Sequence, residues 1–253
     1  MISFRFTIKP LLSLLFTLIL FSAAAQESML CMGGHWSEDE ANLKMKEFRS
    51  SWNDLASWES RSAVIRQGII HGMQLEKMPE IEGQFHAVIH QRREMDGYVV
   101  ENIALESFPG FWITGNLYTP LHPKEKNPAV LCPHGHAPDK RFTADVQIRS
   151  AAFARMGAIV FAYDMVGFGE SHQVNHKMPI ALLLQTYNSG RVLEYLLSRS
   201  DVDPERIGMT GGSGGGTQSF MLSAIDKRIT VSAPVVQVSA HFFGGCVCES
   251  GMP

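Results

Sequence analysis

One segment carries more structural information than any other part of the chain, Arg206-Ile207-Gly208-Met209-Thr210-Gly211-Gly212-Ser213-Gly214-Gly215-Gly216-Thr217-Gln218. It opens with a brief apolar run and passes through a glycine cluster that contains a single serine. Beyond the cluster, apolar residues recur at helical spacings of three and four: Phe220, Met221, Ala224 and Ile225. A strand, a sharp turn and a helix with serine at the turn form a nucleophile elbow, G-x-S-x-G, which exposes the serine hydroxyl.

The small residues around Ser213 have a physical reason. The serine backbone in such a turn is strained, and side chains at Gly211 and Gly215 would collide where strand and helix approach each other. The amide of Gly214 begins the helix, so it faces the place where negative charge would develop on a reacting group.

A glycine-rich loop before a helix can also hold a phosphate or form a plain linker. A Walker loop needs Gly-Lys-Ser/Thr, and no lysine follows this cluster. The dinucleotide fingerprint G-x-G-x-x-G can be aligned with residues 211–216. That fingerprint belongs to the first strand–helix unit of a sheet, whereas this cluster lies late in the chain.

The composition is that of a globular protein. The chain has 253 residues, of which 45% are hydrophobic, so it can bury one sizeable core. The net charge is −3 and the isoelectric point is about 6.4. Because this balance leaves no strongly basic surface, nucleic acid is not expected as a partner.

The N-terminus has the layout of a secretory signal peptide. Arg5 and Lys9 precede an apolar run over residues 11–21, and Ser22-Ala23-Ala24-Ala25 supplies an A-x-A cleavage site before Gln26. The run is about half of the roughly 20 residues that a membrane-spanning helix needs. We therefore expect a signal peptide over residues 1–25 and a secreted or periplasmic mature protein without a stable membrane anchor.

The chain contains four cysteines, Cys31, Cys132, Cys246 and Cys248. Export permits disulfides, but nothing in the sequence fixes a pairing. Cys132 lies in an apolar segment, which is typical of a buried thiol. Cys246-Val247-Cys248 lacks a second pair of ligands, so no metal site is predicted and structural roles are expected for all four cysteines.

Two helices are expected after the cleavage site. Ser37-Glu38-Asp39-Glu40 is a capping box, which predicts a helix that runs to about Arg49. A second helix is expected over residues 57–73, with an apolar side that includes Trp58, Val64, Ile65, Ile69 and Ile70. Residues 26–97 are therefore interpreted as a helical N-terminal extension that packs against the core without taking part in chemistry.

From about residue 98 the hydrophobic pattern favours strands. Residues 99–106 and 111–118 alternate with a period of two and are predicted to form a hairpin. Short, wholly apolar segments separated by helices follow, which is typical of a parallel sheet with right-handed crossovers. Further strands are expected at residues 129–132, 158–163, 207–209 and 229–238, and helices at 146–156, at 180–198 and after Ser213.

Four motifs follow one another in this region: Cys132-Pro133-His134-Gly135-His136, Asp164-Met165-Val166-Gly167-Phe168-Gly169-Glu170-Ser171, Asp203-Pro204-Glu205-Arg206-Ile207 and Gly211-Gly212-Ser213-Gly214-Gly215. In this order they resemble the α/β-hydrolase family, and within it the secreted acetylxylan esterases and dienelactone-hydrolase-like carbohydrate esterases. The resemblance covers about residues 99–238. It implies an α/β-hydrolase fold, with a mostly parallel sheet and helices on both faces.

The resemblance implies roles for individual residues. Ser213 would attack an ester carbonyl and form an acyl-enzyme that water later hydrolyses. The backbone amide of Gly214 would donate one hydrogen bond to the oxyanion, and the resemblance assigns the second to the backbone amide of His136. Gly211 and Gly215 would support the elbow. No cofactor is implied.

The other motif residues are expected to shape loops. His134 and His136 both precede the serine, whereas in this fold the histidine base follows it. His134 is therefore expected to pack and, with Gly135, to shape the loop rather than to act as a base. Asp164 is expected to be a hydrogen-bonding residue of its loop, with a role as triad acid less favoured. His172 and His176, further along that loop, are expected to be solvated.

The residues after Ser213 depart from the family pattern. The only acids there are Asp226 and Glu249, and the only histidine is His241. The family places its acid and its histidine after two further strands. We therefore interpret residues 98–253 as a partial α/β-hydrolase domain, the N-terminal part of a longer hydrolase truncated after about the sixth strand, with little activity by itself. A non-standard triad that uses Glu249 and His241 is the alternative.

The function that the resemblance implies is that of an exported serine esterase. Its substrates would be short acyl esters, of the acetyl type, on polysaccharides or oligosaccharides. Two alternatives remain open: another carboxylic-ester hydrolase or a serine peptidase of the same fold, and a catalytically inactive binding protein on a hydrolase scaffold. The substrate class rests on the resemblance and on export, because no residue pattern identifies a sugar.

Overall fold

The computed structural model describes residues 37–81, 83–236 and 246–250. It consists of two compact units, Met1–Asn53 and Asp54–Pro253. The predicted signal peptide, Cys31 and His241 lie outside the described residues. None of the helices within those ranges is both long and apolar enough to cross a membrane.

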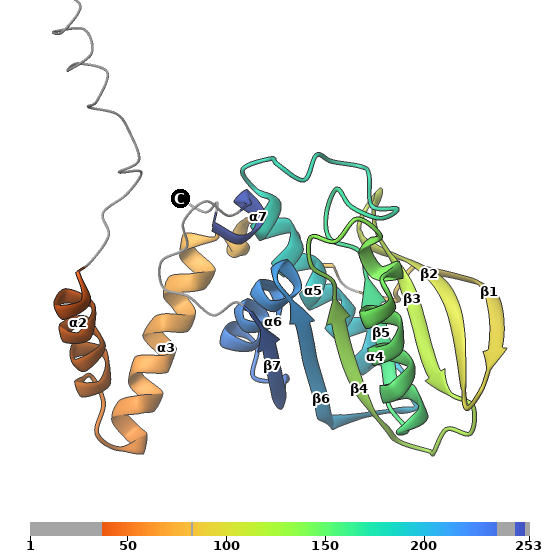
Figure 1. The fold of residues 1–253 in the computed structure, drawn as a ribbon, viewed down its shortest axis with the longest axis horizontal. Helices are drawn as coiled ribbons and strands as arrows, with labels where there is room; N and C mark the ends of the chain where they lie inside the picture. Colours follow the sequence, from red (N-terminus) through yellow and green to blue (C-terminus); the bar gives the residue numbers. More distant parts are fainter. Residues whose placement is uncertain (1–36, 82, 237–245, 251–253) are drawn as a thin grey trace, which may run out of the picture. The chain divides into compact units, whose positions relative to one another are not determined.

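The described part of the first unit is one helix, α2 (Glu38–Ser50) (Figure 1). Its start confirms the predicted capping box. The Ser37 amide donates to Glu40 Oε2 at 2.8 Å, and the Glu40 amide donates to Ser37 Oγ at 3.4 Å. No residue of α2 is buried, so the stabilisation described for this helix is local.

The second unit begins with α3 (Leu55–Gly72), close to the helix predicted over residues 57–73. Asp54 caps its start and accepts a hydrogen bond from the Ser57 amide at 2.8 Å. The helix contacts α6 (Gly214–Ile225). Much of the predicted apolar side nevertheless stays exposed, including Trp58, Val64 and Ile65. A short 3-10 helix, η1 (Leu75–Lys77), follows.

A seven-stranded sheet forms the centre of this unit, in the order β1-β2-β3-β5-β4-β6-β7 (Figure 1). The pairs β1/β2, β2/β3 and β3/β5 are antiparallel, whereas β5/β4, β4/β6 and β6/β7 are parallel. All six predicted strands are present. The strands are β1 (Ala87–Met95), β2 (Tyr98–Phe108), β3 (Phe111–Pro120), β4 (Asn127–Pro133), β5 (Ile159–Tyr163), β6 (Val202–Gly212) and β7 (Val231–Val235).

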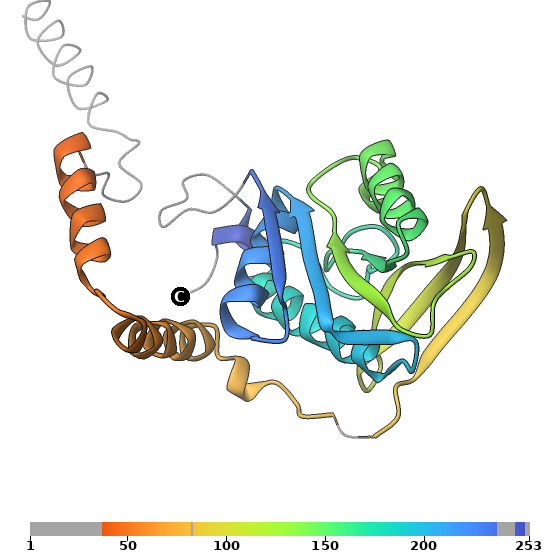
Figure 2. The same ribbon diagram turned by 90° about the horizontal axis from the view of Figure 1, so that it is seen from below.

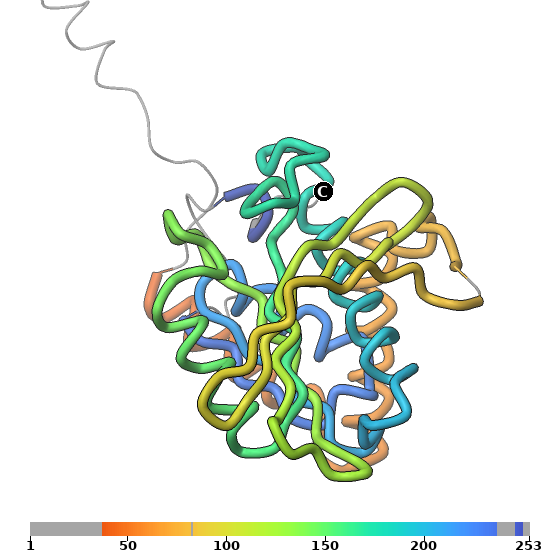
Figure 3. The backbone as a smooth tube through the Cα atoms, turned by 90° about the vertical axis from the view of Figure 1, so that its right-hand side faces the viewer, coloured from red at the N-terminus to blue at the C-terminus, as the bar shows by residue number. Residues whose placement is uncertain are grey.

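The first strand, β1, was not predicted and falls within the stretch expected to be helical. It forms one edge of the sheet, nearest the viewer in Figure 3, and nearly all of its residues are exposed. A bulge interrupts its pairing with β2 between His90 and Arg93, where Gln91 has a φ of +56°. The strand carries charged residues and lacks an apolar period, so hydrophobic periodicity could not reveal it.

Helices cover both faces of the sheet (Figure 2). Alternate residues of a strand point to opposite faces, so Cys132 and Ala162 face α4 (Ala144–Arg155). Leu131 and Phe161 face the other side, where they pack with α5 (Ala181–Ser198) and α6. The predicted helices at residues 146–156, at 180–198 and after Ser213 are therefore confirmed.

The parallel strands bring the predicted motifs to one edge of the sheet. Because β4, β5 and β6 run in the same direction, the loops that follow them meet at their carboxyl ends. These loops carry His134 to His136, Asp164 and Ser213. A last short helix, α7 (Val247–Ser250), contacts α5 and α6.

Gly115 in β3 lies too close to β5 to carry a side chain. A Cβ atom there would lie 2.5 Å from Ala162 O and 2.6 Å from a ring carbon of Phe161. Gly115→Ala is expected to lower the free energy of unfolding in urea by about 1–3 kcal/mol, because the strands must separate to admit the methyl group.

The matched control is Gly190→Ala in α5. Nothing lies within 4 Å of the position of its Cβ atom, so this change is expected to leave the free energy of unfolding unchanged or to raise it by up to about 1 kcal/mol. Equal destabilisation by the two substitutions would contradict the close approach of β3 to β5.

Candidate active site

Ser213 occupies a sharp turn between β6 and α6. Its backbone has φ = +53° and ψ = −121°, a conformation that residues other than glycine rarely adopt. The Ser213 amide donates to Val235 O at 3.0 Å, and the Thr217 amide donates to Ser213 O at 3.0 Å. The end of β7 and the first turn of α6 therefore hold the strained serine, which is partly exposed at the N-terminus of the helix.

Backbone contacts explain the glycines beside the serine. A Cβ atom on Gly211 would lie 2.5 Å from Pro133 O at the end of β4, and one on Gly215 would lie 2.4 Å from the same oxygen. A Cβ atom on Gly216 would lie 2.6 Å from Val235 O. Larger residues would push β4 or β7 away, so this turn requires glycine at all three positions.

The loop after β4 lies directly against the serine. A Cβ atom on Gly135 would be 2.6 Å from Gly212 O and 3.1 Å from Ser213 Cβ. His134 is buried; its Nδ1 donates to Gly135 O at 2.8 Å, and its Nε2 accepts from the Met165 amide at 3.2 Å. Since a carbonyl oxygen only accepts, Nδ1 carries the proton. His134 thus ties the loop after β4 to the loop after β5.

The ring of His136 covers the start of α6. A Cβ atom on Gly214 would lie 3.0 Å from His136 Cε1. A cleft of about 290 Å³ opens beside the serine, and its wall includes Gly135, His136, Lys140, Asp145, Arg149 and Ser213. Both residues that the sequence assigns to oxyanion binding, Gly214 and His136, therefore lie next to Ser213.

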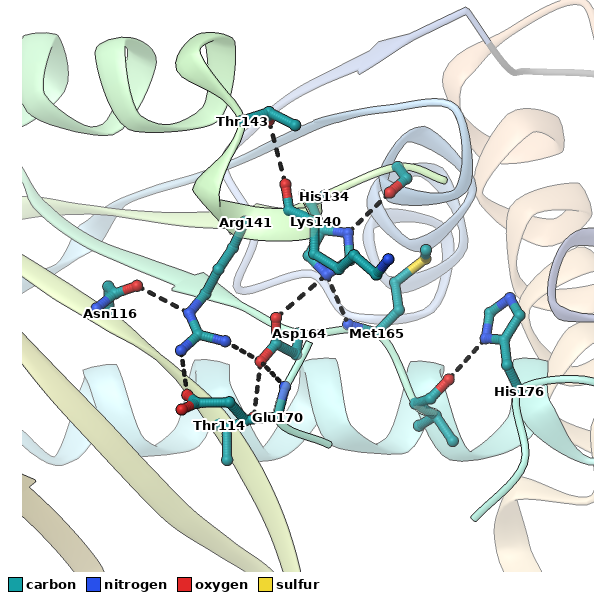
Figure 4. A network of polar contacts seen from close by, with 12 residues as sticks. Thr114, Asn116, His134, Lys140, Arg141, Thr143, Asp164, Met165, Glu170 and His176 are labelled. Atoms are coloured by element: carbon teal, nitrogen blue, oxygen red, sulfur yellow. Dashed lines mark hydrogen bonds and ion pairs between the residues drawn. The ribbon is translucent and has the colours of Figure 1, made fainter. Parts of the chain in front are cut away.

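A buried ion pair holds the loop after β5 (Figure 4). The guanidinium of Arg141 and the carboxylate of Asp164 are almost completely buried and contact each other. Asp164 Oδ2 also accepts from Thr114 Oγ1 at 2.8 Å and from the Glu170 amide at 3.0 Å. Arg141 Nε donates to Asn116 Oδ1 at 2.8 Å, and its Nη2 pairs with the carboxylate of Glu170. These contacts link Asp164 to β3 and to its own loop.

Glu249 extends from α7 to the serine. The Ser213 hydroxyl donates to Glu249 Oε1 at 3.4 Å, and the same oxygen lies 3.5 Å from His136 Nδ1. Both contacts are long for hydrogen bonds. In a Ser-His-acid triad the imidazole lies between the serine and the acid, whereas here the carboxylate meets the serine directly. His241, the other residue of the alternative triad, lies outside the described residues.

The expectation that His176 is solvated is wrong. The residue is 8% exposed and faces His136, with their Nε2 atoms 3.0 Å apart. Burial lowers the pKa of His176; its hydrogen bond to Val166 opposes this shift, and the neighbouring His136 and His134 add to it. The ring is therefore neutral at pH 7. His172 is exposed, as expected.

The three described cysteines, Cys132, Cys246 and Cys248, carry thiols rather than disulfides. Cys132 is buried, as predicted, and burial raises its pKa to about 11. Burial is also the main reason why the pKa of Cys248 is raised, and its sulfur lies 3.1 Å from His136 Nε2.

Two residues that shape the site were not found from the sequence. Arg141 lies in a short 3-10 helix, η2 (Lys140–Phe142), and no local pattern distinguishes this buried arginine from a solvated one. The sulfur of Met165 would lie 3.0 Å from a Cβ atom on Gly214. The sequence offers only a weak indication that Met165 lies at the site. It is an apolar residue at the start of a loop that directly follows a buried strand.

The sheet order, the strained serine between strand and helix and the loop packed against it define the α/β-hydrolase fold. Among proteins of this fold, the chain is 36% identical to the methylesterase BT1017, with a TM-score of 0.78 over 86% of this chain and 50% of that one. Its structural neighbours are thus methylesterases and acetyl xylan esterases of the α/β-hydrolase type.

Two further proteins are similar to the chain. BF1801 of Bacteroides fragilis NCTC 9343, described as an acetyl xylan esterase, shares the fold with 17% identity and a TM-score of 0.60, covering 80% of this chain and 61% of its own. The hydrolase-type protein YtaP of Bacillus subtilis (strain 168) is 31% identical over 134 residues, 45% of each chain. No family model matches. The chain spans about half the length of YtaP and of BT1017.

Asp164→Asn is expected to destabilise the protein by about 3–5 kcal/mol, because it leaves the buried Arg141 guanidinium without its counter-charge. The measurement is the free energy of unfolding in urea at neutral pH.

Glu170→Gln is the matched control, since the Glu170 side chain pairs with the same arginine but is 60% exposed. Its effect is expected to stay below about 1 kcal/mol. If the two substitutions had the same effect, the buried pair would not be what holds the loop.

Proposed function

We propose that the protein is a carboxylic-ester hydrolase that acts on carbohydrate esters through Ser213. The observation that carries the proposal is the strained serine at the N-terminus of α6, in contact with the loop after β4. A serine is held in this conformation only when the surrounding structure enforces it, and such strain is concentrated at functional sites.

In the proposed reaction, Ser213 Oγ attacks the ester carbonyl carbon while its proton passes to a base. The resulting oxyanion accepts hydrogen bonds from the backbone amides of Gly214 and His136, each worth roughly 3 kcal/mol. Collapse of this intermediate expels the alcohol and leaves an acyl group on the serine. Water then attacks the acyl-enzyme, releases the acid and restores the hydroxyl. No cofactor takes part in these steps.

The base is expected among residues that follow Ser213, as in other members of this fold. Within the chain, His241 and Glu249 are the candidates. The contact of Glu249 with the serine supports a place at the site for its carboxylate, but a carboxylate is a weaker base than an imidazole at neutral pH. The proposal therefore needs a histidine to complete it, supplied by His241 or by a part of the protein beyond this chain.

Methyl esters of sugar carboxyl groups are the substrate class that we favour. On the cleft wall Arg149 pairs with Asp145 at 3.8 Å, so no acid among the described residues of that wall balances the positive charge of Lys140. A polymer that carries free carboxylates beside its esters would be attracted to this charge. The similarity to a methylesterase at 36% identity supports the same choice. Acetyl esters, the class expected from the sequence, are the alternative, supported at the level of the fold by the acetyl xylan esterases.

Export is part of the proposal. A signal peptide over residues 1–25 would deliver the enzyme to the periplasm or the exterior, where polymeric carbohydrate esters occur. We do not expect nucleic acid as a partner, because the net charge of the chain is −3.

The protein produced from its native gene is expected to react with a fluorophosphonate probe, because an activated serine attacks the phosphorus and expels fluoride. Ser213→Ala should abolish the label. Ser223→Ala, a serine of the same helix, should keep it. Persistent labelling of Ser213→Ala would rule out this nucleophile. No labelling of the parent protein would favour a non-catalytic binding protein.

The same assay tests the base. Loss of labelling in His241→Ala, with Glu249→Gln retaining part of it, would place the histidine within this chain. Full labelling in both variants would place the base elsewhere in the protein.

Substrate class is tested by comparing the release of methanol from a methyl-esterified polyuronide with the release of acetate from acetylated xylan. We expect methanol release to exceed acetate release at least tenfold at equal ester concentration, because only the polyuronide presents carboxylates to Lys140. The reverse order would assign the acetyl esters. Turnover of peptide amides alone would contradict both.

A further inference from the structure

Four side chains with metal-binding atoms converge beside the serine. They are His136 from the loop after β4, His176 from the loop after β5, and the pair Cys246 and Cys248 at α7. One ligand atom from each lies within 4.8 Å of all the others. The two histidines are 40 residues apart in the chain, and His136 is 112 residues from Cys248. Folding therefore creates the group from segments that are remote in the sequence.

Hydrogen bonds orient the histidine nitrogens toward the centre of this group. His176 Nδ1 donates to Val166 O at 2.6 Å, so its Nε2 has no proton and presents a lone pair. That lone pair faces His136 Nε2 at 3.0 Å, and His136 Nε2 also lies 3.1 Å from Cys248 Sγ. Without an ion, His136 Nε2 has two partners at these distances and can donate to only one of them at a time. A cation in the centre would receive lone pairs from every member instead.

The outer contact of His176 is that of a metal ligand, and His136 has a carboxylate near the corresponding nitrogen of its ring. A ligating imidazole usually donates its other N–H to a backbone carbonyl or a carboxylate, which fixes the ring. His176 does so with Val166 O. His136 Nδ1 has the carboxylate of Glu249 at 3.5 Å, and that side chain is 5% exposed.

The types of donor atom in this group indicate which metal ion it would bind. Two sulfurs and two imidazole nitrogens are the donors of a closed tetrahedral zinc site, and two thiolates neutralise the charge of the ion. In such a site the ligand atoms would be about 3.3–3.8 Å apart. The observed atoms lie within 4.8 Å of one another, so the separations need adjustments of about 1.5 Å or less. The single residue between the cysteines is fewer than the usual two to four, but both sulfurs already belong to the same group.

We propose that His136, His176, Cys246 and Cys248 bind one Zn²⁺ in a structural site. The ion would fasten α7 to the two loops that border Ser213, and would thereby hold Glu249 beside the serine. All four coordination positions are filled by protein, so the ion has none left for a substrate. The site does not depend on the proposed ester hydrolysis.

The test is metal content and cobalt spectroscopy of the native gene product, purified under reducing conditions. We expect one Zn²⁺ per chain by elemental analysis. After chelation, titration with Co²⁺ should give the ligand-field bands of a tetrahedral ion and a thiolate-to-cobalt charge-transfer band. Cys248→Ser and His176→Ala should weaken Zn²⁺ binding by more than the roughly 10- to 100-fold lost with an outer partner of a ligand.

Matched controls come from the same protein. His172→Ala removes an exposed histidine of the same loop, and Cys132→Ala removes a buried thiol outside the group. Both should keep one Zn²⁺. Cys246→Ser changes a partly exposed ligand, so it tests the site if the buried variants fail to fold.

Two results would overturn the proposal. One is less than a tenth of an equivalent of Zn²⁺ in the reduced preparation, with no thiolate-to-cobalt charge-transfer band after titration with Co²⁺. The other is Zn²⁺ binding that His172→Ala weakens as much as His176→Ala does.

Discussion

The close approach of two backbone segments, the end of β4 and the turn from β6 into α6, is the constraint on which the site depends. A single carbonyl oxygen, that of Pro133, leaves no room for a side chain on either Gly211 or Gly215. Because the two backbone segments are closely packed, the serine turn has little freedom to move relative to the loop after β4. Main-chain contacts therefore position Ser213 and the two backbone segments beside it. The surrounding side chains pack against this fixed backbone arrangement.

A buried ion pair also stabilises the loop after β5. Arg141 and Asp164 place opposite charges in the interior, where neither would be tolerated alone. The polar side chains of Thr114 and Asn116 satisfy this pair from β3. The antiparallel hairpin at the beginning of the sheet thus has a role beyond covering the core, because it supplies hydrogen-bond partners for the loop after β5. The loops that follow the parallel strands are supported here by a strand that runs in the opposite direction.

Local signals in the sequence were enough for most of the fold. The capping box at Ser37, the hairpin over residues 99–118 and the apolar strands each depend on neighbouring residues, so periodicity and turn chemistry predicted them. The strand β1 was missed because its apolar residues do not alternate with polar ones and its pairing with β2 is bulged. The prediction that His176 is solvated was wrong for another reason, because the residue is buried. Its burial results from packing against His136 and Phe168, which no window of neighbouring residues can contain.

The bulged, charged edge formed by β1 has a consequence for how the protein behaves among other chains. An exposed strand offers unpaired amides and carbonyls, which can template the addition of a strand from a second molecule. In β1 the interruption at Gln91 breaks the regular ladder, and Arg92, Arg93 and Glu94 place charge along it. These features oppose polymerisation at that side of the sheet. They protect a newly made or crowded protein from aggregation without any contribution to chemistry.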